Sequence, residues 1–171
     1  MSDLIIGLLA WAVAHTAYVP PPSTPDIEYQ PQAALVAAVC PTEGESCEPR
    51  AYYGDGSGTV VMRDSFRHAR GLRVRAILVH ELVHYLQDLS GRWPEMTCLS
   101  WAERETEAYR MQAEYLVAQG VSRAAIAMPR FDAAQCSDDT TPTATADEFA
   151  AATPTPPRDG ETARGDYGGP V

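Results

Sequence analysis

A helical stretch that carries two histidines and a glutamate constrains this chain of 171 residues more than any other feature. From about Leu72 to Leu89 the apolar residues recur at helical spacing, and Gly91 followed by Pro94 marks the end of the helix. Within it, residues 80–84 read His-Glu-Leu-Val-His. Histidines four positions apart stand one turn above each other on one helical face, so both rings can reach a single metal ion. The fold must therefore bury this helix and still leave room for a cation on that face.

The glutamate between the histidines predicts what such a metal site would do. Glu81 lies beside the face of His80 and His84, where it can take a proton from a water molecule activated by the metal and return it to a leaving group. Zinc suits this role because it accepts three protein ligands and keeps a fourth position open for water. The alternative is a pair of surface histidines beside a solvated glutamate.

A second predicted helix supplies the third ligand. It begins near Ser100, a predicted N-cap with Glu103 at the capping-box position, and runs to Gly120. The residues three and four positions away from Glu105 are apolar or aromatic, which places its carboxylate on the buried side of this helix. Burying a carboxylate is unfavourable unless a positive charge meets it, so we predict Glu105 as the ligand.

Helical geometry assigns the other charged residues of this segment to its solvent-exposed side: Glu103, Arg104, Glu107, Arg110 and Glu114. Glu107 is nevertheless the alternative third ligand. An interpretation without a metal also remains, in which Glu105 forms an ion pair with an arginine of the stretch 63–75.

The two motifs together resemble the glutamate-type zincins, the gluzincins, in which a second helix after the His-Glu-x-x-His helix carries Glu-x-x-Ala-Asp or a close variant. The matching segment, residues 105–109, reads Glu-Thr-Glu-Ala-Tyr. The resemblance implies a metallopeptidase in which His80, His84 and Glu105 bind one zinc ion per chain. It also implies that Glu81 is the general base and that the substrate is a peptide or protein.

Tyr109 departs from this pattern, because the larger families carry Asp or Asn there to orient a ligand histidine. Backbone carbonyls or Asp88 would have to take over that task. With His-Glu-Leu-Val-His-Tyr-Leu-Gln before it, Glu-x-x-Ala-Tyr-x-x-Gln resembles a small bacterial zincin-like family of uncharacterised function. This resemblance supports metal binding more than proteolysis, so a zinc-binding interaction module without catalysis is the alternative function.

Around the two helices we expect an α+β fold, a minimal zincin-like domain with a short antiparallel sheet. Residues 51–53 and 59–62 are β-prone and flank the glycine-rich segment 54–58, which is typical of a hairpin. Zincin clefts have an edge strand above the metal helix, to which an extended peptide can add as a further strand. Residues 59–62 are the predicted edge strand.

The chain is predicted to divide into four segments. Residues 1–17 are either a signal peptide or an apolar helix packed on the domain, because the apolar run ends in a small-x-small pattern but no Lys or Arg precedes it. A proline-rich connector follows at 18–26. The zincin-like domain spans 27–136 and begins with a helix over 27–39, and residues 137–171 form a disordered tail rich in Thr, Pro, Gly and Asp.

The cysteines and the net charge bear on the cellular location of the protein and on its partners. The four cysteines contain no Cys-x-x-Cys pair, so a cysteine-based zinc site is not expected. Three pairings are open, and Cys40–Cys47 with Cys98–Cys136 would agree with export to a periplasmic, envelope or secreted location. Reduced thiols would instead agree with a cytoplasmic location. The net charge of −10 disfavours nucleic acid as a partner, and the apolar N-terminal run is too short to form a stable membrane span. The sequence leaves the substrate and the oligomeric state open.

Overall fold

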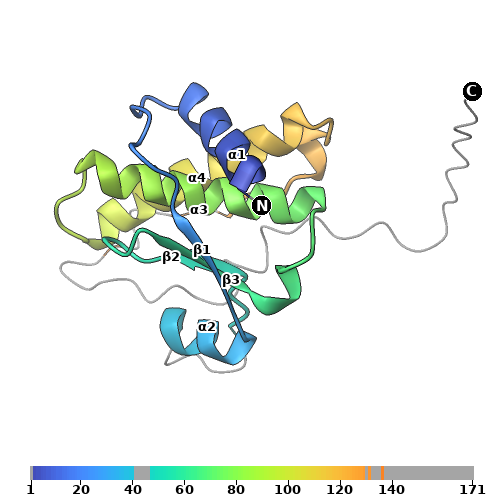
Figure 1. The fold of residues 1–171 in the computed structure, drawn as a ribbon. Coiled ribbons are helices and arrows are strands. Elements are labelled where there is room, and N and C mark those ends of the chain that lie inside the picture. Colours follow the sequence, from blue (N-terminus) through green and yellow to red (C-terminus); the bar gives the residue numbers. More distant parts are fainter. Residues whose placement is uncertain (1, 41–46, 130, 132–135, 137–171) are drawn as a thin grey trace, which may run out of the picture.

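The protein has the expected α+β architecture. The computed structural model describes residues 2–40, 47–129, 131 and 136. Figure 1 shows α1, α3 and α4 on one face of a small sheet and α2 on the other. The elements follow in the order α1 (Ser2–Ala14), β1 (Asp26–Gln30), α2 (Gln32–Val39), β2 (Ala51–Tyr53), β3 (Thr59–Arg63), the 3-10 turn η2 (Asp64–Phe66), α3 (Leu72–Ser90), α4 (Cys98–Ala118) and the 3-10 turn η3 (Arg123–Ala125).

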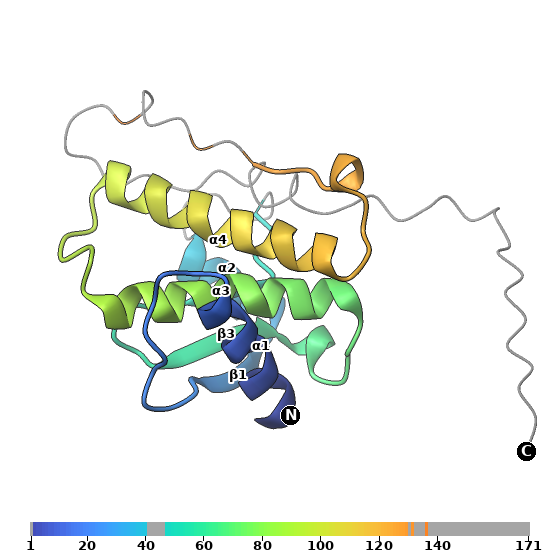
Figure 2. The ribbon, with the colours of Figure 1, turned by 90° about the horizontal axis from the view of Figure 1, so that it is seen from above.

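The helix α3 is the centre of the fold. Every residue from Ala76 to Gln87 is buried, so α3 is covered on all sides rather than on one face. The sheet, α1 and α4 provide that cover, and Figure 2 shows α3 and α4 lying side by side and antiparallel. Gly91 ends the helix in the left-handed conformation, with φ of 61°, as its position in the sequence predicts.

The sheet has three strands in the order β1-β3-β2, and it corrects two predictions. The hairpin of β2 and β3 is antiparallel as expected, but β1 pairs with β3 in parallel, so the sheet is mixed. Residues 26–30 form this extra strand, where a helix over 27–39 was predicted. Ile27 and Tyr29 alternate with the more exposed Asp26 and Glu28, a period of two, and Pro31 separates the strand from α2.

The second correction concerns the edge of the sheet. Residues 59–62 were predicted as the edge strand, but β3 is the central strand, and Val60 and Met62 are fully buried. The edge strand that packs on α3 is β2. The strand order could not be predicted, because β3 is central only through its pairing with β1, and β1 was predicted as part of a helix.

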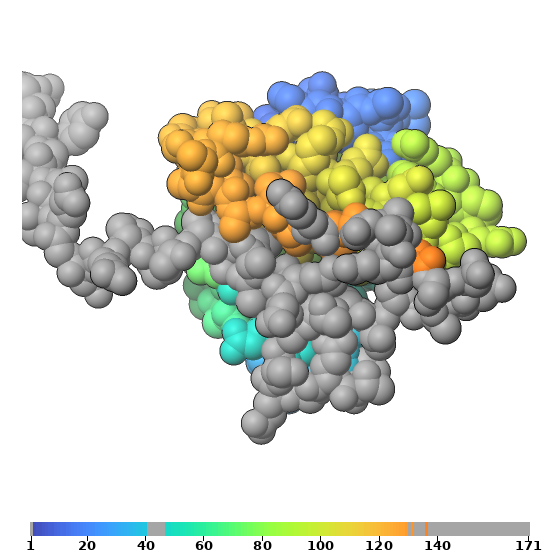
Figure 3. All heavy atoms as spheres, turned by 180° about the vertical axis from the view of Figure 1, so that it is seen from behind, coloured from blue at the N-terminus to red at the C-terminus, as the bar shows by residue number. Residues whose placement is uncertain are grey.

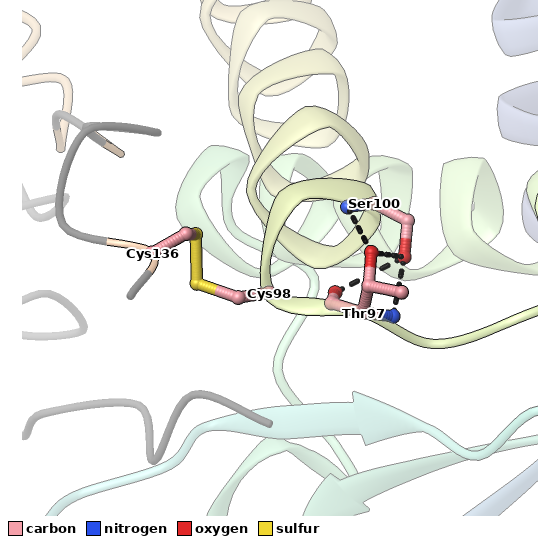
Figure 4. The surroundings of a disulfide bond; sticks show 4 residues. All are labelled: Thr97, Cys98, Ser100 and Cys136. Atoms are coloured by element: carbon pink, nitrogen blue, oxygen red, sulfur yellow. Dashed lines mark hydrogen bonds between the residues drawn. A yellow bond between two sulfur atoms is a disulfide. The ribbon is translucent and has the colours of Figure 1, made fainter. Parts of the chain in front are cut away.

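The start of α4 also differs from the prediction. The N-cap is Thr97, whose side chain accepts a hydrogen bond from the backbone N–H of Ser100 at 3.1 Å, while the Ser100 hydroxyl accepts one from the backbone N–H of Thr97 at 2.8 Å. Ser100 is therefore the third helical residue and not the cap. The Cys98–Cys136 disulfide lies beside this capping box (Figure 4), and Cys40–Cys47 forms the other bond, which confirms the favoured pairing.

Residues Ser2–Ala14 form the helix α1, which packs on the rest of the domain. In α1, Ile5, Leu8, Leu9 and Ala12 are buried, and Trp11 meets Tyr115 of α4 edge to face at 5.1 Å. Among the residues that the structure describes, no helix is both long and apolar enough to span a bilayer. The predicted tail at 137–171 lies outside the described residues.

Candidate metal centre

Two turns of α3 bring the predicted histidines together. His80 and His84 lie one turn apart, and their Nε2 atoms are 3.0 Å from each other. The rings meet edge to face, with centroids 4.7 Å apart. Both residues are buried, at 6% and 8% exposure, because the sheet and α4 cover this part of α3. These histidines are therefore not the solvated surface pair of the alternative interpretation.

Glu105 of α4 completes the group, as predicted. Its Oε2 lies 3.4 Å from Nε2 of His80, and its Oε1 lies 3.1 Å from Nε2 of His84. The two histidines, and no arginine of the stretch 63–75, are its ion-pair partners in the described part of the chain. The alternative ligand Glu107 is engaged elsewhere, since it accepts hydrogen bonds from the hydroxyl of Tyr18 at 2.5 Å and from Nε2 of Gln87 at 3.0 Å.

The three ligand atoms fit a divalent cation. In a tetrahedral zinc site with bonds of about 2.0–2.1 Å, neighbouring ligand atoms lie about 3.3 Å apart. The two Nε2 atoms are 3.0 Å apart, and each lies 3.1 or 3.4 Å from a different carboxylate oxygen of Glu105; one ligand atom from each residue lies within 4.8 Å of the other two. The donor set of two imidazoles and one carboxylate is one that zinc and related metals bind. His80, His84 and Glu105 could therefore hold a metal ion.

Electrostatics without a metal show how strongly the site attracts positive charge. Burial lowers the pKa of His84, but the carboxylates of Glu105 and Glu81 outweigh that effect and raise it to about 9. Burial raises the pKa of Glu105, yet the two histidines hold it well below its usual range. In the metal-free protein at neutral pH the site therefore keeps a proton on His84, and a metal ion must displace that proton to bind.

Glu81 lies next to the ligands but is not one of them. It is 6% exposed, and this burial raises the pKa of its carboxyl despite the opposing effect of His80 and His84. The backbone amide of Tyr53, in the edge strand β2, favours the ionised form. A carboxyl with a raised pKa beside a metal site is suited to accept a proton and to donate it again.

Gln87 orients His84, a role that the sequence analysis did not assign to it. Its Nε2 donates to the carbonyl of Arg104 at 3.0 Å, which turns its Oε1 toward His84. Nδ1–H of His84 then donates to that oxygen at 2.8 Å, so Nε2 is the nitrogen that gives up its proton to a metal. The spacing was a usable signal, because Gln87 follows His84 by about one helical turn. Asp88, the predicted candidate, instead accepts hydrogen bonds from the Tyr53 hydroxyl and the Gly56 N–H.

The burial of Arg104 contradicts its predicted place on the solvent-exposed face of α4. It was predicted on the exposed side, but it is 5% exposed and donates from Nε to Oε1 of Gln87 at 3.3 Å. Its two terminal nitrogens bind both carboxylate oxygens of Asp55, at 2.6 and 2.5 Å. The hairpin turn between β2 and β3 is thereby connected to His84 through Arg104 and Gln87.

Tyr109, the residue that departs from the gluzincin pattern, packs against a ligand. Its ring lies edge to face with His80 at 4.3 Å and stacks on Phe131 at 5.5 Å. Phe131 also meets Trp101 of α4 at 5.2 Å, so aromatic rings cover the ligand on this side. In the view from behind, α4 and the described residues after it (yellow to orange) form the upper part of the surface, and the β2–β3 region (teal) is visible in the lower part (Figure 3).

One comparison with known proteins gives a match. A family described as "Domain of unknown function (DUF6647)" matches residues 1–142. The chain belongs to the DUF6647 family. The match includes all four residues of the site, every helix and strand, and all four cysteines of this DUF6647 domain. No curated protein and no solved structure matches it.

Proposed function

We propose that this DUF6647 domain is a zinc-dependent metallohydrolase, and specifically a peptidase. The observation that carries the proposal is the convergence of His80, His84 and Glu105 on one point, with Glu81 beside them. Two consecutive helices provide these groups: α3 carries the histidines at the spacing that a shared metal requires, and α4 carries Glu105. The stoichiometry is one zinc ion per chain.

Zinc held there would polarise a substrate carbonyl and lower the pKa of a water molecule. Glu81 takes the proton from the attacking water and passes it to the leaving nitrogen, which its raised pKa favours. Gln87 keeps His84 in the tautomer that presents Nε2 to the metal. Burial of all four side chains excludes bulk water and strengthens the electrostatic interactions among them.

An extended peptide would add to the free edge of β2. The N–H of Arg63 donates to the carbonyl of Arg50 at 3.0 Å, so by the alternation of an antiparallel pair the backbone groups of Ala51 and Tyr53 point away from β3. These groups face the side on which Glu81 lies, since the Tyr53 amide acts on its carboxylate. Backbone pairing at this edge would hold a scissile bond beside the metal.

The proposal also includes the cellular location of the protein. Both disulfides are typical of an oxidising environment. We propose that the protein is exported, to the periplasm, the envelope or the medium. The apolar N-terminal segment would direct that export.

The alternative is a zinc-binding module without catalysis. The burial of the site favours it, because the three ligands are 6–9% exposed and leave little open surface at the metal. In that case the metal would connect α3 to α4 and stabilise the domain. Such a module would bind zinc in a closed four-coordinate site and would cleave no peptide.

The proposal is tested by metal content and turnover in matched variants. We expect about one zinc per chain in the wild type by elemental mass spectrometry, loss of the metal in Glu105→Ala, and retention in Glu107→Ala. Glu81→Gln should keep the metal and lose peptide cleavage by at least about a hundredfold. Absence of zinc from the wild type after zinc is offered would overturn the metal site, and full turnover in Glu81→Gln would overturn the mechanism.

A further inference from the structure

Positive charge is concentrated in one short part of this acidic chain. Six of its thirteen basic residues lie between positions 50 and 75, although the net charge is −10. The two acidic residues of that stretch are already paired, Asp55 with Arg104 and Asp64 with Arg67. The other arginines of this stretch form no ion pair in the described part of the chain, although the carboxylate of Glu48 acts on Arg50.

Arg50 directly precedes β2, and Arg73 lies in the first turn of α3, the helix that carries His80 and His84. Neither forms an ion pair in the described part of the chain, and the buried Nε of Arg50 has no hydrogen-bond partner there. Arg63 lies directly opposite Arg50 in the hairpin, and its hydrogen-bond partners among the described side chains are the neutral Ser65 and Gln32. Like charges opposite each other destabilise a strand pair.

The three guanidinium groups are close enough to act on one another. Burial lowers the pKa of Arg50, the charges of Arg73 and Arg63 lower it further, and the carboxylate of Glu48 opposes these effects without cancelling them. Burial and Arg63 also lower the pKa of Arg73. The first turn of α3, which carries Arg73, contains no acidic residue, and the helix dipole adds positive potential at this end. An anion bound between these groups would relieve the repulsion.

This positive region lies beside the metal ligands. Arg73 precedes His80 by seven residues, which is two turns along the same face of α3 and about 10 Å. Arg50 directly precedes the edge strand β2, and its charge acts on Tyr109, whose ring lies 4.3 Å from that of His80. A peptide along the edge of β2 would therefore pass the metal centre and these arginines in turn.

We propose that Arg50 and Arg73 form an anion-binding subsite, and that the substrate carries a carboxylate about three residues of extended chain from the bond to be cleaved. An acidic side chain or a free C-terminus could supply that carboxylate. The inference rests on the proposed function in taking the substrate to be a peptide, but binding at this subsite needs no turnover. It assigns the arginines to substrate selection, not to the chemical step.

The test measures binding to the full-length, zinc-loaded Glu81→Gln protein. The probes are octapeptides of alanine and glycine labelled with tetramethylrhodamine, amidated at the C-terminus, with one Glu placed at each position in turn. Matched peptides carry Gln at the same position, and a further peptide has a free C-terminus and no Glu. Fluorescence anisotropy should show at least one carboxylate-bearing peptide binding roughly tenfold more tightly than its neutral counterpart.

Three variants decide whether the subsite causes that preference. Arg50→Gln and Arg73→Gln should each abolish it while keeping the zinc content and Tm of the parent protein. Arg123→Gln removes the same charge from the exposed turn η3 and should leave the preference intact. Equal binding of Glu and Gln peptides at every position, no binding of any peptide, or an equal loss in Arg123→Gln would overturn the inference. Turnover of the wild type is measured separately, so a carboxylate preference without cleavage would contradict only the peptidase proposal.

Discussion

Gln87 contributes to the site by fixing the orientation of a ligand. It is 1% exposed, and each hydrogen-bonding group of its amide has a defined partner: His84 and Arg104 on the oxygen, and the Arg104 carbonyl and Glu107 on the nitrogen. Because these bonds oppose rotation of the amide, Nδ1 of His84 always meets an acceptor. In the neutral imidazole the metal-binding nitrogen, Nε2, is then the unprotonated one, so the proton that zinc displaces from the metal-free site is the one on Nε2.

Replacing Gln87 should therefore weaken metal binding without removing a ligand. We expect Gln87→Ala to lower the zinc affinity about 10–100-fold, as loss of such an orienting group does at other zinc sites. Competition with a chromophoric chelator measures this affinity. Asp88→Asn is the matched control, because Asp88 is the next residue of α3 but bonds to the hairpin turn and not to a ligand. Equal losses in both variants would show that Gln87 acts only through local packing.

The pKa of His84 predicts opposite effects of pH on the metal-free and zinc-loaded proteins. In the metal-free fold this pKa is raised from 6.5 to about 9, so the stabilisation is complete below pH 6.5 and is lost as the pH rises through 9. Zinc competes with that proton, so its affinity should increase over the same range. Thermal melts between pH 6 and 9.5 should show a falling metal-free Tm and a widening gain from zinc.

Glu105→Gln provides the control for this pH dependence, because it removes the carboxylate that raises the pKa of His84. Its metal-free Tm should vary less with pH over this interval. A wild-type metal-free Tm that rises from pH 6.5 to 9 would contradict the prediction.

At the scale of elements, the β2–β3 turn is tied to both helices of the site. Asp55 binds Arg104 of α4 through both carboxylate oxygens, and Asp88 of α3 accepts the N–H of Gly56 at 2.8 Å. The Arg104 guanidinium holds the pKa of Asp55 below its usual range. The turn therefore has a fixed position relative to α3 and α4, and with it the edge strand β2.

Removing Asp55 should destabilise the domain more than removing an exposed acidic residue. In Asp55→Ala the buried guanidinium of Arg104 loses its partner, which we expect to lower the free energy of unfolding by about 1–3 kcal/mol. Glu114→Ala breaks the exposed pair with Arg110 on the same helix and should cost less than about 0.5 kcal/mol. Urea unfolding of both variants measures the difference, and equal losses would contradict a structural role for the Asp55–Arg104 pair.

The sequence predicted some of these helices, strands and site residues and missed others. Local signals predicted α3, its end at Gly91, the β2–β3 hairpin and the group His80, His84 and Glu105, because spacing along a single element determines them. The strand at 26–30 was missed because its partner β3 lies about 30 positions away, and pairing decided its conformation. Arg104 was misplaced because its burial depends on Asp55 in another element.

For the molecule as a whole, the site depends on the packing of α3 against α4. One helix provides two ligands and the other provides the third, so a bound metal would oppose their separation. α1, α4 and the sheet cover α3 from Ala76 to Gln87, and α2 lies on the other face of the sheet. The DUF6647 match covers this whole arrangement and continues past Cys136, so the family unit includes the N-terminal helix and both disulfides.

The bond between Cys98 and Cys136 spans 38 positions and encloses all of α4 and the residues after it. A single protease cut within that enclosed stretch would divide the backbone but would not release a fragment. The nicked protein would migrate as one band on a non-reducing gel and as two bands after reduction. Glu105 lies inside the same covalent loop, so a cut between Cys98 and Glu105 would leave this ligand attached to the histidine helix through the disulfide.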